Sequence, residues 1–344
     1  MARINLLTIH WGLSYGGTMQ TYATVKLLEN LGHQVRVINL VHPKEKMSRL
    51  IAHNHRLSFW IKRIQFAFFR HKYIRHFTQR MYSLHSDKIP PCDYTIVGSD
   101  QVWNKDITGP LCYNYYLDFA DDSVRISLSS SFGKTKWEED TEYTQRVKDL
   151  LLHFKAISVR ELSAQHICQN VFGLNATCLL DPTLLLGNYD SIVEKGREQS
   201  ILYPFLLEKN DSSKQSICKM LASELETPMY EASRFDSYFK RSPKSWLNKM
   251  RNSRYIVTDS FHGLAFSIIF KKDFFVLSTK NPKQFTRLES LLSLLGLSDR
   301  YIRSVDDLIK RNDDLRLHID YGTIDPILET ERKKFQSFIT QNLE

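Results

Sequence analysis

The sequence has few cysteines and no apolar run long enough to cross a bilayer. Its 344 residues include five cysteines, an odd number with no Cys-x-x-Cys spacing. This usage is typical of reduced, structural thiols in a cytoplasmic protein and argues against a disulfide framework. The chain passes from Met1 almost directly into an apolar strand pattern, so we expect neither a signal peptide nor a transmembrane helix.

A metal-binding pattern is also missing. The twelve histidines are scattered, and no two of them lie at helical spacing beside a carboxylate, so we expect no metal site. Positive charge, by contrast, is abundant: the formal net charge is +9, with 47 Lys and Arg against 38 Asp and Glu. This balance favours anionic partners, namely phosphates, nucleic acid or an acidic membrane surface, without choosing among them.

The chain is long for one hydrophobic core. Apolar residues make up 42% and aromatic residues 12% of the sequence, which is typical of a packed globular protein. At 344 residues we expect two domains. Glycine, asparagine and charged residues dominate between Leu186 and Ser200, so we place the linker there. The predicted domains are 1–190 and 200–325, followed by a C-terminal helix at 326–344.

The N-terminal residues predict a βαβ unit. Ile4 to Ile9 and Val35 to Leu40 have the composition of buried strands, and a helix between them is followed by Gly32 as its C-cap. The first strand leads into a glycine-bearing loop, His10 to Gly17. Its glycines do not match the G-x-G-x-x-G pattern, so a loop for an acceptor or sugar is favoured over a dinucleotide site.

A second polar loop follows the predicted strand Tyr94 to Val97. It comprises Gly98 to Asn104, where Gln101 and Asn104 could bind hydroxyl groups and Trp103 could stack on a sugar ring. A turn with a tryptophan in the core is the competing interpretation.

Farther on, the short strand Ile157 to Val159 runs directly into Arg160, which places a fixed cation at a strand end.

Residues 55–77 form an aromatic and basic segment with helical periodicity. Its apolar residues share one face and comprise Leu57, Trp60, Ile61, Ile64 and Phe68. Its cations are Arg56, Lys62, Arg63, Arg70, Lys72 and Arg75. Two interpretations remain open: a surface helix packed on a sheet, or a helix that lies on an anionic membrane surface.

The second half of the chain repeats the βα pattern. We expect a strand at Ile201 to Leu207, a helix at Lys214 to Leu225 and a further strand near Met229. A helix starting near Ser242-Pro243 precedes the stretch around which the chain is organised.

That stretch runs from a buried strand, Tyr255 to Val257, through a polar cluster into an apolar helix. A parallel strand that feeds a helix directs unpaired N–H groups toward the edge where open α/β sheets bind ligands. Asp259 and Ser260 can cap the helix, and Gly263 would let a ligand approach the backbone. His262 lies in the turn; a capped helix with a structural histidine is the alternative.

Taken together, these motifs resemble the polysaccharide pyruvyl transferase family, in the family's order and over about residues 4–300. The matching segments are Tyr15-Gly16-Gly17 with Gln20-Thr21-Tyr22-Ala23, Gly98-Ser99-Asp100-Gln101-Val102-Trp103-Asn104, Ser158-Val159-Arg160-Glu161-Leu162-Ser163, Asp181-Pro182-Thr183, Thr258-Asp259-Ser260-Phe261-His262-Gly263, and Arg287-Leu288-Glu289-Ser290-Leu291-Leu292. Other branches of the family carry an arginine two residues before the histidine. This chain has Ser260 there and is similar to a Ser-Phe-His-Gly branch, which directs attention to Arg160 and Arg287 as cations.

The resemblance implies an α/β, GT-B-like fold with two Rossmann-type domains facing a crevice, the N-terminal domain on the acceptor side and the C-terminal domain on the donor side. It implies transfer of an enolpyruvyl-derived group from phosphoenolpyruvate to two hydroxyls of a sugar, as a cyclic ketal. His262 is the expected catalytic residue. The expected donor-binding residues are Arg160, Ser260, Phe261, Gly263 and Arg287. The expected acceptor-binding residues are Gly16, Gly17, Gln20, Asp100, Gln101, Trp103 and Asn104.

The chemistry fits these residue types. Arginine offers a bidentate fork to carboxylate or phosphate, and histidine transfers protons near neutral pH. No metal or other cofactor is required, because arginine and a helix N-terminus can neutralise the leaving phosphate. The expected partners are phosphoenolpyruvate and a sugar, free or carried on a polyprenyl diphosphate. The expected location is the cytoplasm, including the inner membrane face.

Two other classes of function remain. A GT-B glycosyltransferase that uses a nucleotide sugar would share the fold and the sugar acceptor, and product mass would distinguish it. A nucleic-acid-binding module follows from net charge alone, and it would need basic residues and stacking aromatics along one groove. The Ser-Phe-His-Gly turn at a strand end argues for a reactive site, so we expect no nucleic-acid partner.

Overall fold

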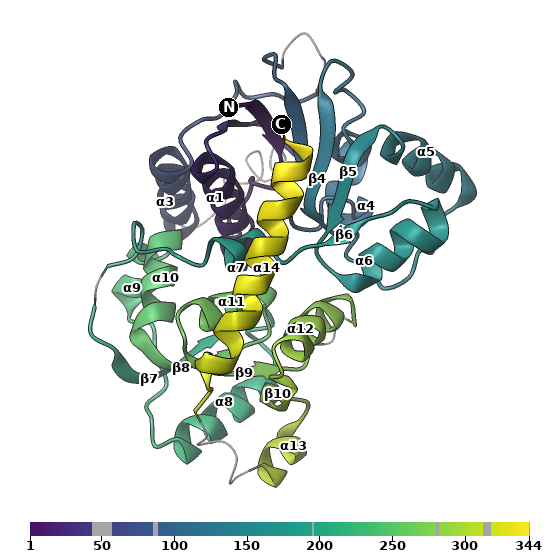
Figure 1. Ribbon diagram of the computed structural model, residues 1–344. Helices are drawn as coiled ribbons and strands as arrows, with labels where there is room; N and C mark the ends of the chain where they lie inside the picture. The colour runs from purple at the N-terminus through teal and green to yellow at the C-terminus, as the bar shows by residue number, and fades with distance from the viewer. Residues whose placement is uncertain (43–56, 85–88, 195, 280–281, 312–317, 344) are drawn as a thin grey trace. The chain divides into compact units, whose positions relative to one another are not determined.

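The computed structural model describes residues 1–42, 57–84, 89–194, 196–279, 282–311 and 318–343. The chain forms two compact α/β units (Figure 1). Unit 1 comprises Met1–Leu186 and Thr330–Glu344, and unit 2 comprises Gly187–Glu329. The predicted linker starts where unit 1 first ends. The return of the C-terminal residues to unit 1 was not predicted from the sequence.

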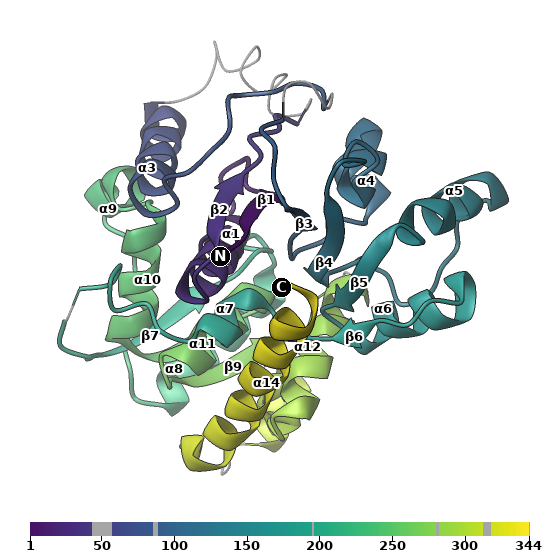
Figure 2. The ribbon, with the colours of Figure 1, turned by 45° about the horizontal axis from the view of Figure 1, so that its top comes forward.

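Unit 1 is built on a six-stranded sheet with the order β2-β1-β3-β4-β5-β6, which Figure 2 shows strand by strand. All neighbouring strands in it are parallel. The strands are β1 (Arg3–Leu7), β2 (Gln34–Val37), β3 (Tyr94–Val97), β4 (Val124–Ser130), β5 (Phe154–Val159) and β6 (Thr177–Cys178). The helices are α1 (Tyr15–Asn30), α3 (Leu57–Tyr73), α4 (Lys105–Thr108), α5 (Thr141–Leu151), α6 (Leu162–Ile167) and α7 (Pro182–Leu186).

Unit 2 has a four-stranded parallel sheet with the order β10-β9-β8-β7. The strands are β7 (Gln199–Phe205), β8 (Ser253–Thr258), β9 (Asp273–Leu277) and β10 (Tyr301–Ile302). The helices are α8 (Ser212–Glu224), α9 (Arg234–Phe239), α10 (Pro243–Asn252), α11 (Phe261–Ile269), α12 (Pro282–Leu294), α13 (Val305–Lys310) and α14 (Tyr321–Asn342), the last of which continues into unit 1.

Local signals account for many of these boundaries. Ser14 caps α1 by accepting a hydrogen bond from the Gly17 N–H, and Gly32 follows the helix with a φ of +85°. Ser242 caps α10, with Pro243 at its first position, as predicted. Because each sheet is parallel, the carboxyl ends of its strands lie along one edge, where ligands of open α/β sheets bind.

Two predicted elements differ from the structure. Met229 forms only an isolated bridge with Leu202 and no strand, since Pro228 before it has no N–H to donate. The C-terminal helix begins at Tyr321, so Pro326 lies inside it; the sequence prediction used proline as a start signal. The predicted helix over residues 55–77 corresponds to α3, and residues 55 and 56, including Arg56, lie outside the described residues.

The last turns of α14 complete the packing of unit 1. The Arg332 guanidinium donates to the Leu185 carbonyl oxygen at 3.2 Å. Phe335, Phe338 and Ile339 are buried. Residues at the end of the chain therefore contribute to the core of a unit whose other residues all precede position 187.

Candidate functional site

The turn from β8 to α11 carries the predicted catalytic residue. Ser260 caps α11, and its hydroxyl accepts a hydrogen bond from the Gly263 N–H at 3.4 Å. His262 lies in the first turn of the helix and is 9% exposed. The Phe261 ring stands edge-on to the imidazole, with centroids 5.4 Å apart. The turn thus brings an imidazole, a hydroxyl and the N–H groups of a helix start together, as an anion site requires.

Gly263 has a different role from the one predicted. A Cβ at this position would lie 2.1 Å from Thr258 Oγ1 and 3.0 Å from a ring carbon of Phe205. The space in front of the glycine is therefore filled by the protein, and the expectation that a ligand approaches the backbone there is wrong. Gly263 instead allows α11 to pack closely against the ends of β7 and β8.

Asp259 does not cap α11, which corrects the second capping expectation. Its carboxylate is buried and accepts hydrogen bonds from the N–H groups of Leu207 and Glu208 at 2.6 and 3.1 Å. The buried Lys214 ammonium donates to it at 2.7 Å and lies 2.9 Å from a Glu208 carboxylate oxygen. Asp259 therefore fixes the loop after β7 beside the β8–α11 turn. The sequence prediction missed Lys214 and Glu208.

The other predicted cation of unit 2 is also buried. Arg287 lies on α12, which packs against α11, and only 8% of its surface is exposed. Arginine is the side chain best suited to a buried charge, because its fork can satisfy several acceptors at once. Its placement on the helix next to the His262 turn keeps it a candidate for donor binding.

In unit 1, Arg160 is the centre of a buried charged network at the carboxyl ends of the strands. It donates to Asp181 at 2.8 Å and lies 3.7 Å from carboxylate oxygens of both Asp100 and Glu161. Burial lowers the pKa of Arg160, but the three carboxylates outweigh that effect and hold the pKa above its usual value. Arg160 therefore joins carboxylates that follow three strands of the sheet, β3, β5 and β6.

Further hydrogen bonds extend this network. Asp181 also accepts from the Ser99 hydroxyl at 3.1 Å and from the N–H and hydroxyl of Thr183 at 2.9 and 2.7 Å. Glu161 accepts from the Ser131 hydroxyl. Ser99 and Thr183 belong to the motifs of the family resemblance but received no role in the sequence prediction, and Ser131 lies outside those motifs. Polar residues directly after buried strands were the available signal.

The loop after β3 has an unusual backbone. Asp100 adopts a φ of +80°, and its carboxylate accepts from the Gln101 N–H at 2.9 Å. Asn104 caps α4 and donates to the Gln101 side-chain oxygen at 2.9 Å. A non-glycine residue with positive φ costs free energy and is common at functional sites. Asp100 and Gln101 are partly exposed, whereas Asn104 is buried.

The prediction that Trp103 stacks on a sugar is wrong. Its side chain is 2% exposed, lies parallel to Tyr116 with ring centroids 5.5 Å apart, and donates from Nε1 to the Tyr115 carbonyl oxygen at 2.9 Å. A ring that is covered on its faces cannot accept a sugar. The competing interpretation, a turn with a tryptophan in the core, holds instead.

Buried residues at the start of α1 determine the path of the loop between β1 and α1. Gly16, Gly17 and Gln20 are buried. The Gln20 amide donates to the carbonyl oxygens of Ile9 and Gly17 at 3.3 and 3.1 Å. A Cβ on Gly17 would lie 3.1 Å from the Ile9 carbonyl oxygen. Gly17 and Gln20 therefore fix the path of the loop, and only the exposed atoms of the loop remain for contact with a sugar.

The α3 helix presents the apolar face predicted from the sequence to solvent. Leu57, Ile64 and Phe68 are 68%, 65% and 65% exposed, and Trp60 is 39% exposed. The residues that pack inward are Phe66 and Phe69. The face identified from periodicity is therefore the outer one, and the interpretation that its side chains pack on a sheet is wrong for these four residues.

No three His, Cys, Asp or Glu residues in the described part of the chain are placed to hold a metal ion. The predicted site residues fall into two groups, one in each unit. Unit 1 holds the loops after β1, β3 and β5, and unit 2 holds the β8–α11 turn with Arg287.

Similar solved structures support the fold. A functionally uncharacterised protein from Klebsiella pneumoniae subsp. pneumoniae has a TM-score of 0.51 at 9% identity, covering 88% of this chain and 93% of that chain. A putative UDP-N-acetylglucosamine 2-epimerase from Listeria monocytogenes has a TM-score of 0.51 at 11% identity, covering 99% and 96%. The UDP-N-acetylglucosamine 2-epimerase from Rickettsia bellii has a TM-score of 0.50 at 9% identity, covering 99% and 96%.

At these identities the likeness concerns the fold alone. Together with the two parallel sheets, it confirms the predicted α/β, GT-B-like class with two Rossmann-type units.

No curated protein sequence matches the chain. A family model described as polysaccharide pyruvyl transferase matches residues 15–281. This match covers most of the chain and includes the loops after β3 and β5 and the β8–α11 turn. The chain therefore belongs to the polysaccharide pyruvyl transferase family.

Proposed function

We propose that this transferase moves an enolpyruvyl-derived unit from phosphoenolpyruvate onto two hydroxyl groups of one sugar. The vinyl CH2 carbon gains a proton, and one sugar hydroxyl attacks the neighbouring carbon. The second hydroxyl then displaces phosphate from that carbon. Both sugar hydroxyls lose their protons. One of these protons balances the proton added to the vinyl carbon, and the other leaves on inorganic phosphate. The product is a pyruvate ketal on a polysaccharide or a lipid-linked oligosaccharide.

The observation that carries this proposal is the β8–α11 turn within a chain of this family. His262 lies at a helix N-terminus, where phosphate and carboxylate are stabilised. Histidine is the side chain best suited in general to proton transfer near neutral pH. We assign proton transfer to His262. Donor binding is assigned to Ser260, Phe261 and the cation Arg287, all of which belong to unit 2. The chemistry requires no metal, because these groups can balance the charge of the leaving phosphate.

On the acceptor side, the partly exposed residues of unit 1 are the ones that a sugar can reach. We assign hydrogen bonding to sugar hydroxyls to Asp100 and Gln101. The buried residues Gln20 and Asn104 keep their place in the proposal by holding the two loops in shape. Gly17 acts through the close packing of the loop after β1, and Gly16 is buried beside it.

Product analysis tests the reaction. The purified protein is incubated with phosphoenolpyruvate and a panel of sugars and oligosaccharides, and the products are analysed by mass spectrometry with a parallel phosphate assay. We expect an acceptor that gains one three-carbon carboxylate unit, with one phosphate released per unit transferred. Release of a nucleotide from a nucleotide sugar, with hexose transfer and no use of phosphoenolpyruvate, would instead identify a glycosyltransferase.

We also propose that the enzyme acts on an acceptor held at an anionic membrane surface. No helix among the described residues is long and apolar enough to cross a membrane, so attachment would be peripheral. The exposed apolar face of α3, with cations beside it, has the composition of an interfacial helix. Each cation near an anionic surface contributes about 1 kcal/mol of attraction at low salt.

Co-sedimentation with vesicles tests this attachment. The variant Ile64→Ser/Phe68→Ser removes two exposed apolar side chains, and we expect binding to anionic vesicles to fall at least about tenfold. The matched control is Leu152→Ser/Leu162→Ser, which removes two exposed leucines elsewhere in unit 1 and should bind like the wild type. Equal binding of wild type and the α3 variant, or indifference to salt and lipid charge, would make α3 an ordinary surface helix.

A further inference from the structure

The two faces of α3 differ: one exposes apolar side chains, and the other packs against unit 1. Successive residues of an α-helix turn by about 100°, so side chains three and four positions apart share a face. Leu57, Trp60, Ile64 and Phe68 form the outer row described above. On the opposite side lie Lys62, Phe66, Phe69, Arg70 and Tyr73, of which the two phenylalanines are buried. α3 lies beside α1 in unit 1 (Figure 1).

The inner cations bind the loop after β1. The Arg70 guanidinium donates to the carbonyl oxygens of His10 and Gly12 at 3.1 and 3.0 Å. The Lys62 ammonium donates to the Leu13 carbonyl oxygen at 3.1 Å. Hydrogen bonds from a charged donor are about twice as strong as neutral ones. Three carbonyl groups of one short loop are therefore satisfied by α3.

Ring contacts reinforce this attachment. The Lys62 ammonium lies 4.8 Å from the centroid of the Tyr15 ring, and that ring lies 5.2 Å from the ring of Phe66. Tyr15 is the first residue of α1 and follows the cap Ser14. We call the loop from residue 10 to residue 14 the β1–α1 loop. Its flanking residues Ile9 and Gly17 are held by the Gln20 amide, and the loop itself is held by α3 on its outer side.

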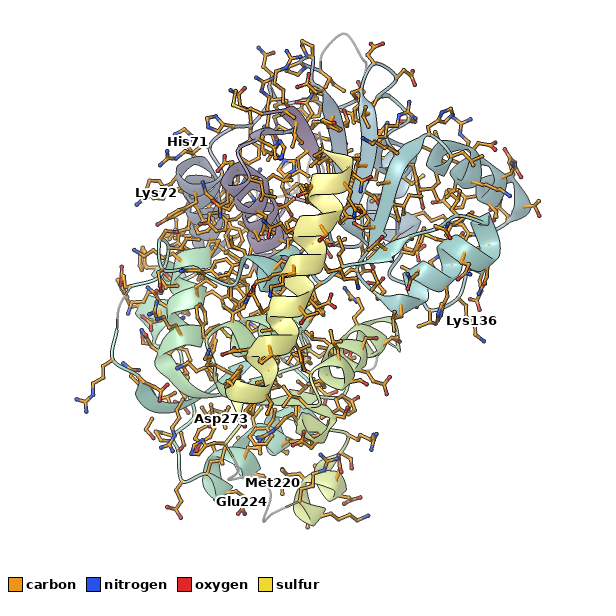
Figure 3. All side chains as sticks on the ribbon, in the orientation of Figure 1. His71, Lys72, Lys136, Met220, Glu224 and Asp273 are labelled. Atoms are coloured by element: carbon orange, nitrogen blue, oxygen red, sulfur yellow. The ribbon has the colours of Figure 1, made fainter. Side chains whose placement is uncertain are left out.

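The outer face fits an anionic lipid surface in particular. Between Glu45 and Asp87 the sequence contains no acidic residue. Lys72 and Arg75 are exposed at the end of α3, and Figure 3 shows His71 and Lys72 projecting outward from the helix. Apolar side chains flanked by cations, with no carboxylate to repel lipid phosphates, are typical of helices that lie in a membrane interface.

We propose that α3 couples binding of an anionic lipid surface to the conformation of the β1–α1 loop. The outer row enters the interface, and Lys62 and Arg70 transmit the resulting restraint to the carbonyl groups of residues 10, 12 and 13. The β1–α1 loop is then ordered when the enzyme is bound to the membrane surface that carries the sugar acceptor. This inference rests on the proposed membrane-held acceptor, and it adds a physical link between the surface and the site.

Amide hydrogen exchange measured by mass spectrometry tests the coupling without turnover. The full-length protein is compared alone, with phosphatidylcholine vesicles, and with vesicles that also contain phosphatidylglycerol. We expect exchange in residues 10–17 to slow at least about threefold with the anionic vesicles only. In the variant Arg70→Gln, the outer face is intact, so vesicle co-sedimentation should persist while this slowing is lost. Lys136→Gln, which removes an exposed lysine elsewhere in unit 1, serves as the control and should retain the slowing.

If Arg70→Gln does not fold, Lys62→Gln removes a single carbonyl contact and should reduce the slowing instead. Failure of the wild type to bind anionic vesicles would overturn the coupling. So would binding without slower exchange in the loop, or slowing that persists in both variants. None of these readouts uses phosphoenolpyruvate, so a protein that shows the coupling but forms no ketal would contradict the proposed reaction alone.

Discussion

The variant His262→Ala is expected to lower turnover about 10²–10⁴-fold, the usual contribution of a general acid or base. The side chain lies in the first turn of α11, whose N-cap is Ser260, and the Phe261 ring stands edge-on to it. Truncation to alanine is compatible with a helix, so circular dichroism and the thermal midpoint should stay close to the wild type. Turnover is measured by phosphate release at saturating phosphoenolpyruvate and acceptor.

Two further variants sharpen this result. His166→Ala removes an exposed histidine on α6 and should keep full activity. His262→Gln keeps a hydrogen-bonding group without the ability to titrate near neutral pH. Loss of activity in both His262 variants supports proton transfer. A folded His262→Ala enzyme that retains more than a tenth of wild-type turnover, with a raised KM for phosphoenolpyruvate, would make His262 a donor-positioning residue.

The variant Arg160→Ala is expected to destabilise unit 1 by about 3–5 kcal/mol, because it leaves buried carboxylates without their cation. Asp181 is completely buried, and Arg160 is its ion-pair partner at 2.8 Å. Denaturant unfolding followed by tryptophan fluorescence measures the loss. Arg3→Ala removes an exposed arginine that pairs with Asp93 at 2.8 Å and should change stability little, since solvent screens such pairs.

The same position also tests the donor role predicted for Arg160. Arg160→Lys keeps the charge and loses the planar fork, so a folded variant can be examined by calorimetric titration with phosphoenolpyruvate. A direct charge-assisted contact predicts a loss of about 1.5–3 kcal/mol in donor binding. Unchanged binding together with reduced stability would restrict Arg160 to holding the strand ends together.

Features encoded by neighbouring residues could be predicted from the sequence. The apolar strand before Asp259, the Ser260 cap and the helix after it are local patterns, and so are the Ser242-Pro243 start of α10 and Gly32 after α1. The polar residues after β3 and β5 were located at strand ends for the same reason, because a buried strand must end where the chain becomes polar.

What the sequence could not provide was the choice among distant partners. Asp259 has the composition of a helix cap, but its carboxylate binds N–H groups more than fifty residues earlier. Trp103 is equally plausible as a sugar platform or as core, and only the position of Tyr116 decides between them. In α3, periodicity identifies an apolar row without stating whether that row faces the protein or the solvent.

The division of the chain constrains the order in which the protein can fold during synthesis. Unit 1 needs the last turns of α14, yet all of unit 2 is translated before them. The N-terminal unit therefore emerges from the ribosome with the surface for Phe335, Phe338 and Ile339 uncovered. It stays incomplete until unit 2 has also been made. Unit 2, by contrast, is a continuous segment and can fold as soon as Glu329 is available, so the later of the two units in sequence can be the first one to be complete.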